Sequence, residues 1–190
     1  MTTASISDDS YDKSIKALHW LTAVLIVAAY AFIELRELFP KGSDLREAMK
    51  ALHFMLGLSV LPLLFPRLLG RFLGKVPAIS PEPPVWQQTT AKLSHLALYA
   101  FMLIMPLLGW LMLSAAGKPI PFFGLHLPPL VAEDKAFAKQ VKEIHEAIGV
   151  FGYYLIALHV LASLYHHYVQ RDNTLLRMSP GQPSRSTNLD

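Results

Sequence analysis

The sequence contains no cysteine among its 190 residues. Disulfides, thiolate-bound iron–sulfur clusters and the covalent attachment of a c-type haem all require cysteine, so none of them is available to this chain. Charge is also scarce, because Asp, Glu, Lys and Arg make up 16% of the residues against a hydrophobic share of 53%. Soluble domains carry about 25% charged residues. The composition therefore favours an integral membrane protein.

A basic surface stripe and a signal peptide are absent as well. The net charge of +3 comes with 17 Lys and Arg residues that are scattered among the loops, whereas nucleic-acid-binding proteins gather such residues on one face. The segment before residue 13 is polar and acidic rather than a basic n-region. We therefore expect no nucleic-acid partner, and we expect the first apolar segment to remain as a membrane span in contact with lipid.

Four apolar segments are present, each close to the ~20 residues that a helix needs to cross a bilayer. They are residues 17–35, 52–73, 93–115 and 148–168. Four spans place both termini on the same side of the membrane. The sequence thus predicts an all-α, integral membrane four-helix bundle that forms a single domain over residues 1–190.

The longest linker joins the third span to the fourth. Its first half is rich in proline and glycine, and its second half has the pattern of a short amphipathic helix. We expect this amphipathic segment to lie over the mouth of the bundle as a cap. Basic residues are nearly balanced between the two sides of the membrane, with a weak preference for cytoplasmic termini.

The histidines are informative because ionisable groups inside a membrane are costly and usually functional. His19, His53 and His95 lie near the starts of the first three spans. The fourth span carries His145 and His159, whose separation of fourteen residues is about 21 Å of rise and nearly a whole number of turns. These two side chains therefore share one helix face at two depths.

Antiparallel spans give each depth a second histidine. His53 joins His145 near one face of the membrane as the outer pair, and His19 joins His159 near the other face as the inner pair. A haem iron with two imidazole ligands is the simplest occupant of each pair. Zinc fits less well, since it prefers three or four protein ligands and no carboxylate accompanies these histidines. His166 lies on the same face, seven residues after His159, and is an alternative ligand.

Glycines follow both outer histidines at helical spacing. Gly57 comes four residues after His53. Gly149 comes four residues after His145, and Gly152 follows about one turn later on the same helix. Glycine lets a flat macrocycle approach the helix backbone, so we expect these three to pack against haem. Packing of helices through small residues explains them equally well.

Several segments together resemble the bacterial cytochrome b561 family over nearly the whole chain, and within it the small members that oxidise superoxide and reduce quinone. These segments are ALHW, AYAFIELRELFP, MKALHFMLG, PFFGL, IHEAIGVFGYYLIALH and HHYVQRDNTLLRMSP.

This resemblance implies a multi-pass protein of a Gram-negative inner membrane with cytoplasmic termini. It implies two haem b groups, with His19 and His159 on the cytoplasmic haem and His53 and His145 on the periplasmic one. It further implies electron flow from superoxide at the periplasmic face to ubiquinone near the cytoplasmic face.

Cationic loop residues at the outer face could steer an anion such as superoxide by electrostatic attraction. The available ones are Arg36, Lys41, Lys118, Lys139 and Lys142. Most are explained as solvated charges on helix ends, and Arg36, within LRELFP, is the preferred steering residue.

We expect quinone at the inner side, with His95 and His166 as partners for its carbonyl oxygens. His95 begins the third span and His166 ends the fourth, so both reach one level, and histidine titrates near neutral pH, where quinone reduction needs protons. We interpret His167 as a functionless interfacial residue and assign no function to His126.

Two other functions remain open. The protein could be an electron-relay and anchor subunit of a partner hydrogenase or dehydrogenase, in which case its activity requires that partner. It could also be a proton or metal transporter, which would show no visible haem absorption.

Overall fold

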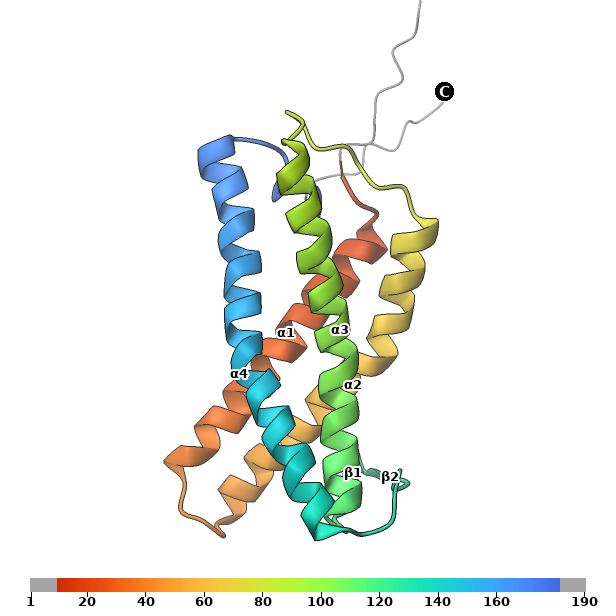
Figure 1. The fold of residues 1–190 in the computed structure, drawn as a ribbon, viewed down its shortest axis with the longest axis vertical. Coiled ribbons are helices and arrows are strands. Elements are labelled where there is room, and N and C mark those ends of the chain that lie inside the picture. Colours follow the sequence, from red (N-terminus) through yellow and green to blue (C-terminus); the bar gives the residue numbers. More distant parts are fainter. Residues whose placement is uncertain (1–9, 182–190) are drawn as a thin grey trace, which may run out of the picture.

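The computed structural model describes residues 10–181. Within that range, four helices are long and apolar enough to cross a membrane, and they form the bundle shown in Figure 1. They are α1 (Lys13–Leu35), α2 (Asp44–Leu73), α3 (Val85–Ala115) and α4 (Lys135–Tyr165). The expected all-α architecture with four spanning helices is therefore confirmed.

The helices pack as two pairs. α1 contacts α2, α3 contacts α4, and α2 joins the pairs by contacting α3. The α1–α2 loop and a small hairpin lie at one end of the bundle, the hairpin end. The α2–α3 connection and the segment after α4 lie at the other, the terminal end (Figure 1).

Helices α2 and α4 begin in polar sequence, well before their apolar segments. Ser43 caps α2, since its hydroxyl accepts a hydrogen bond from Arg46 N at 3.3 Å. Asp134 caps α4 in the same way by accepting from Phe137 N at 3.0 Å. Side chains of this type satisfy amide groups that have no partner in the first helical turn. Both helices therefore present charged turns at the hairpin end.

The amphipathic half of the third linker forms the start of α4 and is not a separate helix over the bundle mouth. Ion pairs between Lys139 and Glu143 at 3.9 Å, and between Lys142 and Glu146 at 3.1 Å, follow its exposed side. The segment contains no proline or glycine that would end the helix before the span. The expectation that this segment caps the mouth of the bundle is thus wrong, because it continues directly into the α4 span.

The proline-rich half of that linker forms the antiparallel hairpin of β1 (Ile120–Phe122) and β2 (Leu125–Leu127). Phe123 and Gly124 at its turn have φ angles of 46° and 84°. Ile120 is buried with Leu58 and Leu113. The hairpin is therefore held against α2 and α3.

The segment after α4 folds back over the terminal end. It contains a π-helical turn, η2 (His166–Gln170), and a 3-10 turn, η3 (Leu176–Met178). Residues 171–178 form what we call the C-terminal clasp. Asn173 exchanges hydrogen bonds with Ser80 at 2.9 and 3.2 Å, the Arg177 guanidinium donates to Pro77 O, and Met178 O accepts from Trp20 Nε1 at 2.9 Å. The clasp thereby ties α1 to the α2–α3 connection.

Candidate functional site

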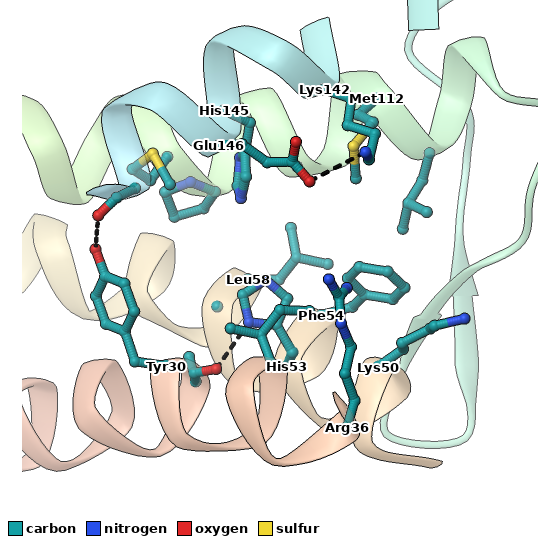
Figure 2. A pocket seen from close by; sticks show the side chains of 18 of the residues that line it. Tyr30, Arg36, Lys50, His53, Phe54, Leu58, Met112, Lys142, His145 and Glu146 are labelled. Atoms are coloured by element: carbon teal, nitrogen blue, oxygen red, sulfur yellow. Dashed lines mark hydrogen bonds and ion pairs between the residues drawn. The ribbon is translucent and has the colours of Figure 1, made fainter. Parts of the chain in front are cut away.

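The outer pair, His53 and His145, lies near the hairpin end. Their ring centres are 6.3 Å apart and the ring planes make an angle of 85°. Figure 2 shows the two rings directed toward each other from α2 and α4. His53 Nδ1 lies 2.8 Å from Ala29 O. Because a carbonyl can only accept, this contact places the proton on Nδ1 and leaves Nε2 with a free lone pair for a metal.

The inner pair, His19 and His159, lies toward the terminal end. Its ring centres are also 6.3 Å apart, with an interplanar angle of 55°. Both side chains are half-buried. The structure therefore brings together the same two pairs that the sequence spacing predicts. His166 makes no ring contact with His19 among the described residues, so His159 is the nearer partner.

The spacing within each pair matches one metal between two imidazoles. An imidazole nitrogen binds a metal ion at about 2 Å. Two imidazoles on opposite sides of the ion then have ring centres about 6 Å apart, once the distance from nitrogen to ring centre is included. Both pairs have this separation in the folded chain. The residues present therefore fit bis-imidazole ligation of iron at both levels.

A cavity of about 890 Å³ surrounds the outer pair, within the range of about 300–1,000 Å³ for cofactor sites. Gly57, Gly109 and Gly149 line it. A Cβ at Gly57 would meet no described atom within 4 Å, and one at Gly149 would meet only Met105 Cε, at 3.6 Å. Two of the predicted glycines thus border open space that a flat ligand could occupy.

Gly152 has a different environment. It is buried, and a Cβ at this position would overlap the Tyr30 hydroxyl and the ring of Phe101. Glycine is needed here because α1 and α3 send large side chains against α4. Helix packing therefore replaces the haem contact that we expected for Gly152.

The cavity also contains a tyrosine pair that the sequence did not identify. The Tyr30 hydroxyl donates to Gly149 O at 2.7 Å, its ring centre lies 4.3 Å from that of Tyr153, and Tyr153 donates to Glu34 at 2.8 Å. The sequence did not distinguish these tyrosines because aromatic residues in an apolar span are also expected as ordinary packing residues. The Tyr30 contact is the upper-left dashed line in Figure 2.

Cationic side chains surround the mouth of the cavity. This cationic rim consists of Arg36, Lys41, Arg46, Lys50, Lys118, Lys139 and Lys142, and the acidic residues that share the lining are Glu34 and Glu146. The five predicted outer-face cations are all included. Arg46 and Lys50 were missed because they precede the apolar segment to which the sequence assigns the second span.

The rim cations differ in their pairing. Glu37 accepts from Arg36 at 2.9 Å and from Arg46 at 2.7 Å. Arg46 is buried and also donates to Arg36 O and Phe39 O, so it is a structural residue. Among the described residues, no carboxylate lies within ion-pair distance of Lys41 or Lys118. These two lysines therefore contribute the least compensated charge at the mouth.

The two residues expected to meet quinone have separate environments. The His95 ring centre lies 5.9 Å from that of His159, and His95 is exposed. His166 Nδ1 lies 2.5 Å from the buried Asp172 carboxylate. The two imidazoles form no hydrogen bond or ring contact with each other in the described part of the chain. The His167 ring makes an edge-to-face contact with Tyr168, with ring centres 4.8 Å apart.

Residues 10–181 match the sequence model of a family described as prokaryotic cytochrome b561. The chain is 42% identical over 163 residues to cytochrome b561 homolog 1 of Escherichia coli (strain K12), across 86% of this chain and 93% of that protein. It is 34% identical over 163 residues to the probable superoxide oxidase CybB of Yersinia pestis, across 86% and 92%. Cytochrome b561 homolog 2 of Escherichia coli (strain K12) is 28% identical, across 85% and 87%. The family match covers all four helices and both histidine pairs.

Proposed function

Because the chain belongs to the prokaryotic cytochrome b561 family of membrane proteins that bind b-type haem, we propose that it holds two haems and transfers electrons between them. This membership confirms the resemblance found in the sequence. We assign His53 and His145 as the residues that would hold the iron of the outer haem, and His19 and His159 as those that would hold the iron of the inner haem. The observation that supports this assignment is the 6.3 Å separation of ring centres in each pair.

The assignment is tested by the haem content of purified variants. His53→Ala and His145→Ala should each lose one of two haems per chain, and His19→Ala and His159→Ala should lose the other, because each removes one of two axial bonds. His95→Ala is the matched control, since its ring is also close to His159, and it should keep both haems. A His53→Ala protein with two haems, or a His95→Ala protein with one, would contradict the assignment.

We propose that superoxide is the electron donor at the hairpin end and ubiquinone the acceptor near the terminal end. Haem supplies reversible one-electron exchange, and iron with two imidazole ligands needs no open position for a substrate. Two superoxide ions release two electrons and leave as two O₂ molecules. Those electrons and two protons convert one quinone to quinol, so that charge and atoms balance.

The residues around each level support these roles. At the hairpin end, Lys41, Lys118 and Arg36 attract an anion towards the cavity. A relative with 34% identity is named a probable superoxide oxidase. Ala29 O holds the ring of His53 in one orientation, which fixes the tautomer that can ligate iron.

At the terminal end, His95 is exposed in the structure, so that a quinone could reach its imidazole. The His95 ring also lies next to His159, close to the source of electrons. His166, oriented by Asp172, is a second group that can hold and donate a proton. We place the terminal end in the cytoplasm and the chain in a bacterial inner membrane, as the resemblance implies.

The second candidate function is an electron-relay or anchor subunit for a partner redox protein. Exposed apolar side chains on the hairpin favour it, since Phe123 is 59% and Leu125 67% exposed. Stopped-flow spectroscopy separates the two functions. The self-contained enzyme reduces its haems after a superoxide pulse and passes the electrons to quinone without another protein, whereas the relay needs its partner.

A further inference from the structure

Arg67 is a charged residue within the α2 span that the proposed reaction does not use. It follows His53 by fourteen residues, which is about 21 Å along the helix and close to a whole number of turns. It is therefore on the histidine-bearing face of α2, at the depth of the inner pair. Its Nη2 atom lies 3.3 Å from His19 Nδ1, and its guanidinium lies 6.0 Å from the centre of the Tyr99 ring.

No carboxylate compensates this guanidinium within the described chain. The ion pairs of residues 10–181 do not include Arg67. Its polar contacts are to His19, whose backbone O is 3.5 Å away, and to the Tyr99 side chain, and neither carries a negative charge. Arginine stays protonated in proteins, and an unpaired charge inside a membrane is costly. The position therefore calls for an anion that the described side chains do not provide.

Ligation of iron by His19 strengthens this requirement. An imidazole that binds a metal through Nε2 carries its proton on Nδ1. Arg67 Nη2 is also a donor, and two donors cannot form a hydrogen bond with each other. Once His19 is a ligand, Arg67 Nη2 can no longer use His19 Nδ1 as an acceptor.

We propose that Arg67 binds a propionate carboxylate of the inner haem and raises the reduction potential of that haem. The inference rests on the proposed inner haem. The planar guanidinium matches a carboxylate with two parallel hydrogen bonds. A fixed positive charge beside the site favours the reduced state, because reduction lowers the positive charge at the iron.

The test is a redox titration of the purified holoprotein followed by haem absorbance, with haem content measured in parallel. Arg67→Gln removes the charge and Arg67→Lys keeps it. Lys75→Gln is the matched control, since it removes an exposed positive charge at the same end of α2. The His53→Ala background, which should retain the inner haem alone, identifies the potential that belongs to the inner level.

We expect Arg67→Gln to lower the inner midpoint potential by at least the 59 mV that corresponds to a tenfold change for one electron. The outer potential, Arg67→Lys and Lys75→Gln should remain near the wild-type values. Loss of the inner haem from Arg67→Gln but not from Arg67→Lys would also support the proposal, because the lysine variant keeps the positive charge that the glutamine variant lacks.

Three results would overturn it. These are unchanged potentials with unchanged reoxidation by quinone in Arg67→Gln, unchanged potentials with slower reoxidation, which would assign Arg67 to quinone binding, and loss of the inner haem from both Arg67 variants. A failure of the proposed function is distinguishable, because the wild-type protein itself would then contain fewer than two haems.

Discussion

At the scale of single residues, pairing decides which charges can act on a substrate. Arg36 was the preferred steering residue from the sequence, but Glu37 binds it at 2.9 Å and also binds Arg46. Lys41 and Lys118 line the same cavity without a carboxylate partner in the described range. The attraction of an anion should therefore depend more on the two lysines than on Arg36.

We expect Lys41→Gln and Lys118→Gln each to lower the second-order rate of haem reduction by superoxide by about two- to tenfold, and Arg36→Gln to lower it less. Added salt should reduce the wild-type rate, because the Debye length is only about 10 Å at 0.1 M ionic strength. Stopped-flow measurements at several salt concentrations check this. Lys135→Gln, at the same end but outside the cavity lining, is the control, and equal rates in all four variants would exclude steering by the rim.

In the proposed reaction, the two terminal-end imidazoles act in the second half, the reoxidation of the haems by quinone. Replacing His95 or His166 by Gln removes an imidazole that could pass on a proton while retaining polarity, so this reoxidation should slow by about 10²-fold or more. Reduction by superoxide should be unchanged. Two-step stopped-flow traces separate these phases, and normal reoxidation in both variants would mean that quinone binds elsewhere.

At the scale of elements, the C-terminal clasp is the part that local sequence patterns cannot reveal. Asn173 and Arg177 bond to Ser80 and Pro77, which are 93 and 100 residues away in the chain. Such contacts depend on how the end of α2, the start of α3 and the end of α4 come together at the terminal end. The RDNTLLR segment carries part of the family resemblance. Its contacts also give it a physical role, because they connect the end of α4 to the α2–α3 connection.

The Asp172 carboxylate should stabilise the clasp. Burial by itself raises the pKa of Asp172, but hydrogen bonds from His166 and Thr174 outweigh burial, and the pKa lies below its ordinary value. A lowered pKa means that the stabilisation is complete at neutral pH and is lost as the pH falls through that value. Asp172→Asn should cost about 1.5–3 kcal/mol at neutral pH.

Hydrogen exchange of residues 171–178 together with thermal unfolding measures this cost. Glu82→Gln, whose carboxylate bonds to Gln88 outside the clasp, should change neither. Equal protection of the clasp amides in wild type and Asp172→Asn would show that the carboxylate does not hold the segment.

Across the whole molecule, periodicity predicted the architecture and the histidine pairs because both follow from helix geometry. Fourteen residues between His145 and His159 fix a shared face and two depths whatever the tertiary packing. Arg67 was not identified, since an arginine near the end of an apolar run has the same pattern as a cation that reaches the interface. The role of Gly152 depends on which side chains α1 and α3 bring to it, and sequence spacing does not contain that information.

The vertical separation of the two histidine pairs also has an electrical consequence. About 21 Å along α4 is roughly two-thirds of a hydrocarbon core of about 30 Å. In the proposed orientation, an electron that moves from the outer to the inner level carries negative charge towards the cytoplasm. At about 2.3 kcal/mol per charge for 100 mV across the full membrane, this step does about 1.5 kcal/mol of work against a voltage that is negative inside.

Proteoliposomes with a potassium diffusion potential can measure that work. A voltage of 100 mV, negative on the side of the terminal end, should shift the distribution of electrons between the two haems by about tenfold toward the outer haem. Collapse of the voltage with an ionophore should reverse the shift. If the distribution of electrons did not change with voltage, both haems would lie at the same depth in the membrane. Each turnover in an intact cell would then charge the membrane, so that removal of superoxide also stores energy.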